Sequence, residues 1–131
     1  GDVLDEMLRG IRLSRDDVYM TNILWDRPPD NRQPTADEIA FYAVFVDRLL
    51  DVIRPAVVVT LGRFSMQYIL KKFDLPQKRG KISQLHGQML KAQAPYGEIY
   101  IVPLYHPAVV LYTASQKDVL REDFEKLRMF V

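Results

Sequence analysis

The side chain best placed to do chemistry is a histidine that ends an apolar run and stands directly before a proline. His106 follows residues 101–105, which read Ile-Val-Pro-Leu-Tyr, and precedes Pro107. The apolar run is typical of a buried strand. The proline biases His106 towards extended backbone and offers no N–H at the next position. We therefore expect the imidazole at the mouth of a sheet, where open α/β folds bind ligands.

Two further loops supply polar groups that would suit a planar polar ligand and an anion. Asn22 ends a segment rich in β-formers, and Gly62 and Arg63 lie between an apolar run and a helical pattern. Because the carboxyl ends of parallel strands share one edge of a sheet, these loops are expected to converge on His106. A carboxamide can both donate and accept hydrogen bonds, and the start of a helix can bind phosphate.

Alternating helices and strands must position these loops, as the hydrophobic periodicity predicts. Thr35 and Glu38 form a capping-box signature for a long helix, and residues 56–61 are a β-branched apolar run typical of a buried strand. The predicted helices start at about residue 2 and cover 35–53, 64–73 and 115–129; the predicted strands cover 17–24, 56–61 and 99–103, with a short hairpin over 82–91. This order predicts an α/β fold, a three-layer α/β/α sandwich with a central, mostly parallel sheet.

The composition excludes several classes of protein. The 131 residues predict one domain with its own core, and the net charge of +1 means that any nucleic-acid site must be a local patch. The absence of cysteine excludes disulfides, thiolate nucleophiles and cysteine-ligated metals within the chain, and we expect no metal and no cofactor. No apolar run approaches the ~20 residues of a membrane span, and no signal peptide is visible. We expect a cytoplasmic monomer without a membrane partner.

Several short motifs occur in the order found in one enzyme family. They are Val18-Tyr19-Met20-Thr21-Asn22, Arg27-Pro28-Pro29-Asp30-Asn31-Arg32 with Pro34-Thr35, Leu61-Gly62-Arg63-Phe64, Lys81-Ile82-Ser83 with Gly87, and Tyr105-His106-Pro107-Ala108. Each motif alone is weak, whereas the ordered set is specific and extends over nearly the whole chain. In this set the sequence resembles bacterial uracil-DNA glycosylases of the family 4/5 group. The resemblance implies hydrolysis of the glycosidic bond of a flipped-out uracil in DNA, as in base-excision repair.

The resemblance also implies roles for individual positions. Asn22 matches the asparagine that reads the uracil edge, and His106 matches the catalytic histidine, which donates to uracil O2 as negative charge develops on the base. Residues 109–111 match an apolar wedge that fills the space left by the flipped base. The implied contacts to DNA come from Arg27, Arg32, Gly62, Arg63, Tyr105, Pro107, Ala108, Val109, Val110 and Leu111.

The sequence departs from the family pattern at three places, one of them Tyr112, which replaces an arginine often found after the wedge. Family members open with a strand and a Gly-Glu-Ala-Pro-Gly-like loop that supplies a water-activating acid, followed by a phenylalanine that stacks on uracil. Residues 1–5 resemble the segment just after that phenylalanine, which implies an N-terminally truncated domain over 1–131 without the first strand. This chain alone is then expected to be inactive or to need a complementing segment. Asp26 and Tyr42 stand where cluster-bearing members carry cysteines, so no iron–sulfur cluster is expected.

Structural roles compete with these functional ones. A histidine before proline at a strand end is often structural, Asn22 can cap a turn with its side chain, and His86, next to Gly87, is expected on the surface. The basic residues Lys71, Lys72, Lys78, Arg79 and Lys81 either lie in solvent or contact phosphate. Three functions therefore compete: a DNA glycosylase, a DNA-binding module of the same fold such as those attached to phage-type DNA polymerases, and a small-molecule-binding α/β domain.

Overall fold

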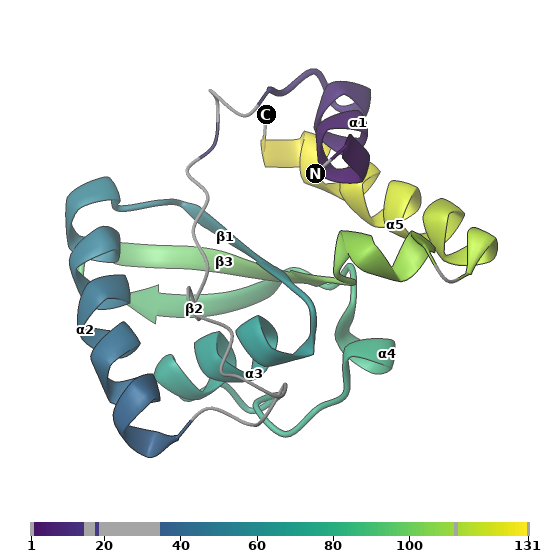
Figure 1. Cartoon of the computed structure of the whole chain (residues 1–131). Helices are drawn as coiled ribbons and strands as arrows, with labels where there is room; N and C mark the ends of the chain where they lie inside the picture. Colours follow the sequence, from purple (N-terminus) through teal and green to yellow (C-terminus); the bar gives the residue numbers. More distant parts are fainter. Residues whose placement is uncertain (1, 15–17, 19–34, 112, 131) are drawn as a thin grey trace. The chain divides into compact units, whose positions relative to one another are not determined.

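The structure is a computed structural model that describes residues 2–14, 18, 35–111 and 113–130, and Figure 1 shows the course of the chain. Its contacts divide the chain into two units, Gly1–Tyr19 with Ala56–Val131, and Met20–Pro55, which are described separately. The predicted strand over 17–24, apart from residue 18, and the proline-rich loop that follows it lie outside the described residues.

In the smaller unit, helix α2 spans Ala36–Ile53. The Thr35 hydroxyl accepts a hydrogen bond from the Glu38 N–H at 3.2 Å, and the Glu38 carboxylate accepts one from the Thr35 N–H at 3.5 Å. This reciprocal pair is the predicted capping box, so the predicted start of the helix is confirmed. The helix ends at Arg54, which takes a left-handed conformation (φ 49°), and Pro55 follows, which cannot continue a helix.

The larger unit is built on a three-stranded sheet with the order β1-β3-β2. Strand β1 (Val57–Leu61) runs parallel to β3 (Gly97–Leu104), and β2 (Leu90–Ala94) runs antiparallel to β3. The parallel register pairs Leu61 with Leu104, so β1 and β3 end at the same edge of the sheet. The predicted α/β class is confirmed, and the described sheet combines one parallel with one antiparallel pair.

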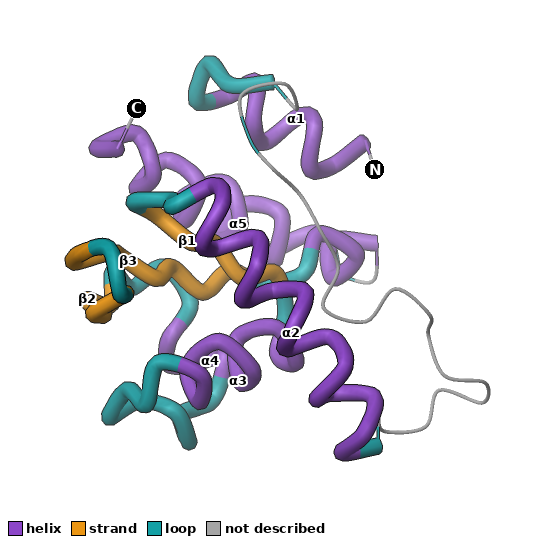
Figure 2. Tube along the Cα trace, turned by 90° about the vertical axis from the view of Figure 1, so that its left-hand side faces the viewer, coloured by secondary structure: helices purple, strands orange, loops and turns teal. Residues whose placement is uncertain are grey.

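Helices cover both faces of this sheet. Helices α1 (Asp2–Gly10) and α5 (Ala114–Lys126) lie on one face, and α3 (Arg63–Lys72) lies on the other, as the two views in Figure 1 and Figure 2 show. On the first face, Val102 and Leu104 of β3 pack into a buried apolar cluster. Its other buried members are Leu4, Met7, Leu8, Ile11, Leu120, Phe124 and Leu127. Within the larger unit the chain therefore forms the predicted α/β/α layers.

Pro103 lies in the middle strand without removing a hydrogen bond from the sheet. Residues two apart in a strand hydrogen-bond to the same side, and the pairing of β3 with β2 ends at Ile101. The missing N–H of Pro103 therefore faces a position beyond the end of β2. The Pro103 carbonyl accepts the Gly87 N–H at 2.7 Å instead. The proline thus ends the pairing with β2, while the pairing with β1 continues to Leu104.

The predicted hairpin over residues 82–91 is wrong. Ile82–Leu85 forms a short helix, α4, and the hairpin of the structure joins β2 to β3 across the turn Pro95-Tyr96. A four-residue helix is too short for periodicity to separate it from a strand. After β3, Pro107–Leu111 forms a 3-10 helix, η3. The closing helix predicted over 115–129 is formed by α5 and by a second 3-10 helix, η4 (Leu127–Phe130), that directly follows it.

Candidate active site

Strands β1 and β3 end side by side, and the loops that follow them bring Gly62 and His106 together. The Gly62 N–H donates to the Leu104 carbonyl at 2.8 Å, which extends the contact between the strands beyond Leu61. A Cβ built on Gly62 would lie 3.2 Å from the Cβ of His106, so the two loops are in close contact. These two loops meet as the parallel arrangement predicts, whereas Asn22 lies outside the described residues.

His106 caps the 3-10 helix η3. Its carbonyl accepts the Val109 N–H at 2.9 Å, and its ring Nδ1 accepts the Ala108 N–H at 3.0 Å. Pro107 suits the first helical position because it has no N–H to satisfy. A nitrogen that accepts a hydrogen bond carries no proton, so the geometry assigns the proton of the neutral ring to Nε2. Nε2 is then the donor nitrogen of the ring, and His106 is an exposed residue at the edge of the sheet.

The start of α3 offers further donors at the same edge. No side chain caps its first turn, and Arg63 and Phe64 are exposed there. The Arg63 guanidinium lies 4.8 Å from the centre of the Phe64 ring, within the range of a cation–π contact. The Ser65 hydroxyl donates to the Leu61 carbonyl at 2.8 Å and ties this turn to the end of β1. A helix start beside an exposed arginine favours an anion such as phosphate.

Replacing Gly62 with alanine is expected to lower the free energy of unfolding by about 1 to 2 kcal/mol. The φ of Gly62 is +91°, which disfavours any side chain, and the added Cβ would press on His106. Equilibrium unfolding in urea measures the change. Gly10→Ala is the control, because Gly10 has open space around its Cα and no positive φ. Equal stability of Gly62→Ala and the parent protein would contradict the expectation.

The other predicted contacts of this loop lie along one short helix. The helix begins directly after the capping His106, and residues 109–111, the predicted wedge, are its last three residues. Ala108 is exposed, Tyr105 and Val109 are half-buried, Pro107 is buried, and Val110 and Leu111 contribute their backbone to η3. The predicted site residues that lie outside the described part of the chain are Asn22, Arg27 and Arg32.

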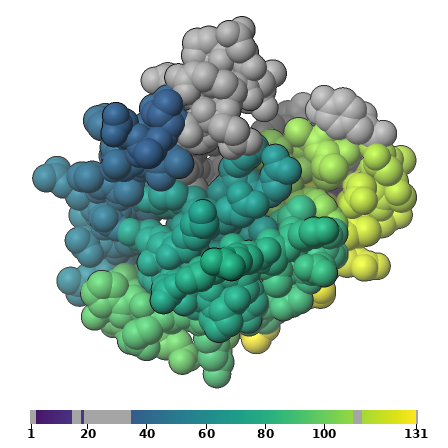
Figure 3. Space-filling model, turned by 90° about the horizontal axis from the view of Figure 1, so that it is seen from below, coloured from purple at the N-terminus to yellow at the C-terminus, as the bar shows by residue number. Residues whose placement is uncertain are grey.

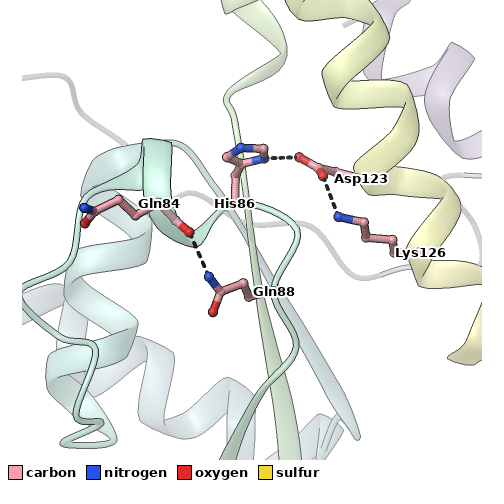
Figure 4. A network of polar contacts seen from close by, with 5 residues as sticks. All are labelled: Gln84, His86, Gln88, Asp123 and Lys126. Atoms are coloured by element: carbon pink, nitrogen blue, oxygen red, sulfur yellow. Dashed lines mark hydrogen bonds and ion pairs between the residues drawn. The ribbon is translucent and has the colours of Figure 1, made fainter.

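His86 is not the surface residue that the sequence predicted. Its side chain is 26% exposed, and its Nδ1 lies 2.6 Å from Oδ2 of Asp123, a residue of α5 whose side chain is 2% exposed (Figure 4). The His86 ring also lies 4.7 Å, centre to centre, from the ring of Tyr105. Sequence reasoning missed this pair because the two residues are 37 positions apart and Asp123 stands among many charged residues.

The predicted basic residues lie in a segment, 71–81, that comprises the last two residues of α3 and the loop after it, on the surface seen in Figure 3. Lys71, Arg79 and Lys81 are exposed. Lys72 is half-buried, and desolvation lowers the pKa of its amine. Lys78 donates to the Asp74 carboxylate, and this hydrogen bond lowers the pKa of that carboxyl. Lys78 thus has a partner within the chain, and a phosphate contact by the exposed basic residues stays a prediction.

Two classes of feature are absent from the described residues. They hold no group of three or more His, Cys, Asp or Glu side chains placed to bind a metal ion. In the same part of the chain, no helix is both long and apolar enough to cross a membrane. The whole chain lacks cysteine, so it can supply no thiolate ligand to a metal or an iron–sulfur cluster.

The fold and the meeting loops are those of an α/β protein, and comparison with known proteins gives its family. Residues 1–128 match the model of the uracil DNA glycosylase superfamily, and the chain belongs to this superfamily. It is 40% identical over 127 residues to the type-4 uracil-DNA glycosylase of Archaeoglobus fulgidus, a match that covers 97% of the chain and 63% of the relative. The type-4 enzyme of Sulfurisphaera tokodaii is 39% identical over 129 residues, with coverages of 98% and 58%.

The chain spans less than two thirds of the length of these two glycosylases. It is also 29% identical over 112 residues to a DNA polymerase of Bacillus phage SP01, a match that covers 86% of the chain and 11% of the polymerase. The predicted membership of the uracil-DNA glycosylase superfamily is confirmed.

Proposed function

We propose that the protein containing this chain is a uracil-DNA glycosylase. It hydrolyses the N-glycosidic bond of a uracil that has been flipped out of DNA, as in base-excision repair. The observation that carries the proposal is the His106 imidazole, which accepts the Ala108 N–H at Nδ1 and lies exposed beside Gly62. The likeness to type-4 uracil-DNA glycosylases supports the same activity.

In the proposed reaction, the bond between N1 of uracil and C1′ of the deoxyribose breaks, and its electron pair passes to the base. Negative charge develops on uracil O2, where the Nε2–H of His106 donates a hydrogen bond. Because the cap already orients the ring, little reorganisation is needed as the charge forms. Water adds its hydroxyl to C1′ and the base takes up a proton, which gives free uracil and an abasic site. None of the residues named above is given the role of activating this water.

Recognition comes, in this proposal, from groups around the histidine. The Asn22 carboxamide pairs with the N–H and carbonyl edge of uracil. The start of α3, with Gly62 and Arg63, contacts phosphate, and residues 109–111 fill the gap left by the base. Further contacts to DNA come from Arg27, Arg32, Tyr105, Pro107 and Ala108. The protein acts as a monomer on the DNA of the bacterial nucleoid, in the cytoplasm.

The direct test uses the full-length protein and oligonucleotides, single- and double-stranded, that contain one uracil. Release of uracil is followed by alkaline cleavage of the abasic site. We expect cleavage only at the uracil and none in the same sequence with thymine. Binding of the oligonucleotide without any abasic product would contradict the proposal.

Asn22→Asp is expected to weaken the discrimination between uracil and cytosine. A carboxylate accepts hydrogen bonds but donates none, so it can accept the cytosine amino group and loses the donor to the uracil carbonyl. Uracil release should fall, and cytosine release should become measurable in a mismatched duplex. Gln93→Glu makes the same chemical change at an exposed position of β2 and should leave both rates unchanged. An unaltered preference in Asn22→Asp would exclude Asn22 from base recognition.

A non-catalytic DNA-binding module of the same fold is the second candidate. The match to a phage DNA polymerase favours it, because there the similar segment is a small part of a much longer protein. This candidate predicts binding to DNA with a strong dependence on salt and no preference for uracil. The oligonucleotide experiment above separates the two candidates.

A further inference from the structure

Asp123 is a buried carboxylate with a partner at each oxygen. Its side chain is 2% exposed; Oδ2 lies 2.6 Å from His86 Nδ1, and Oδ1 lies 3.4 Å from the Lys126 amine (Figure 4). Burying a carboxylate is costly unless hydrogen-bonded partners surround it. The carboxylate therefore holds the His86 ring with Nδ1 turned towards α5.

The same histidine contacts Tyr105, the residue that follows strand β3 and leads to the candidate active site. Its ring lies 4.7 Å from the ring of Tyr105, with the two planes inclined by 35°. The next residue, Gly87, donates its N–H to the Pro103 carbonyl at 2.7 Å. Both the side chain of His86 and the backbone beside it therefore hold the end of β3. Tyr105 is the residue directly before His106.

We propose that Asp123 and His86 are positioning residues for the candidate active site, an inference that rests on the proposed function of His106. Asp123 orients the His86 ring, and the His86 ring holds Tyr105. Tyr105 in turn sets the direction in which the chain leaves β3 and enters the His106 loop. On the opposite edge of β3, the Gly62 N–H holds the same strand end. The loop that carries the His106 imidazole thus starts at a strand end that is contacted by His86 on one side and by Gly62 on the other.

Breaking the Asp123–His86 pair is expected to slow uracil release, because His106 would then be placed less accurately. A hydrogen bond to a developing charge depends on geometry, and a misplacement of about 1 Å can cost about a hundredfold in rate. We expect a smaller loss, about tenfold, because Gly62 and the Ala108 N–H still hold the histidine when the pair is broken.

Two variants test the pair, and a third is a matched control. Asp123→Asn keeps the size of the side chain and removes its charge. In His86→Asn the amide nitrogen stands in the place of Nδ1, so the bond to Asp123 can remain while the ring against Tyr105 is lost. Glu125→Gln removes a carboxylate from the same helix, but Glu125 is 46% exposed and pairs with Arg128, itself exposed. This control should leave uracil release unchanged.

The full-length protein is assayed for single-turnover uracil release, for the Kd of uracil-containing duplex and for unfolding in urea, with and without His106→Ala. Each test variant should slow release about tenfold, change Kd by less than about twofold, and have no further effect once His106 is alanine. A residue that acts through another shows this non-additivity, whereas a general loss of stability does not. The same loss of rate in the His106→Ala background, or no loss in either variant, would overturn the proposal.

Nitrogen NMR of the His106 ring gives a readout that needs no activity. Asp123→Asn and His86→Asn should shift the ring nitrogen signals, and Glu125→Gln should not. A protein that releases no uracil but shows these shifts would refute the proposed function and support the positioning role. Release of uracil with unshifted signals and unchanged rates would refute the positioning role alone. If Asp123→Asn fails to fold, His86→Asn decides the same comparisons.

Discussion

Replacing His106 with alanine is expected to slow uracil release by about a hundredfold, because the loss of one donor to a developing oxyanion has effects of this size. The Nε2–H would act mainly on charge that forms in the transition state, so the Kd for uracil-containing DNA should change little. Single-turnover release with the full-length protein in excess over an oligonucleotide measures the chemical step separately from product dissociation.

Two further variants separate the donor of His106 from its capping acceptor. In His106→Asn the amide oxygen can still accept the Ala108 N–H, which now donates to Nδ1 at 3.0 Å, but no group replaces the Nε2–H. This variant should be as slow as His106→Ala. In His106→Gln the amide nitrogen reaches about as far as Nε2, so part of the rate should return. If His106→Asn keeps the full rate, the donor role is wrong and the residue matters only as a cap.

Gly87→Ala is expected to lower the free energy of unfolding by about 3 kcal/mol. The φ of Gly87 is +76°, and an added Cβ would lie 2.3 Å from Oδ1 of Asp123 and 2.8 Å from the Lys126 amine. The carboxylate cannot move away freely, because its other oxygen is bonded to His86 inside the protein. The backbone strain and the clash therefore add. Equilibrium unfolding in urea measures the loss.

Gly97→Ala separates these two contributions. Gly97 also has a positive φ, +143°, but its Cα faces open space within 4 Å. Gly97→Ala should therefore lower the free energy of unfolding by about 1 kcal/mol, the effect of the backbone strain alone. An equal loss at Gly87 and Gly97 would mean that Asp123 yields to the new methyl group, and the rigid packing inferred for the buried carboxylate would be wrong.

Much of the fold could be predicted because its signals are local. Thr35 and Glu38 are three residues apart, and their reciprocal hydrogen bonds mark the start of α2 wherever the helix packs. The β-branched run at 57–61 and the helical spacing from residue 2 likewise depend on neighbours in the chain. The hairpin predicted over 82–91 failed because a four-residue helix carries too few positions to show a period.

The candidate site was predicted only in part for the same reason. Pro107 limits the backbone of its neighbour, so the sequence alone places His106 at the end of a strand and before a turn. The parallel order of β1 and β3 brings Gly62 to the same edge, and this too follows from the alternation of helices and strands. The choice of Nε2 as the protonated nitrogen came only with the fold, since it depends on where the Ala108 N–H points.

By itself, then, the sequence determined the elements, their order and the candidate histidine, because these depend on residues a few positions apart. Only the tertiary structure decided that His86 is half-buried against Asp123 and that Asp123 is buried. In the sequence, Asp123 is one acidic residue in a charged helix, and nothing near it distinguishes it from Glu125. Its burial depends on α5 packing against a segment 37 residues earlier in the chain, and no local pattern encodes such a contact.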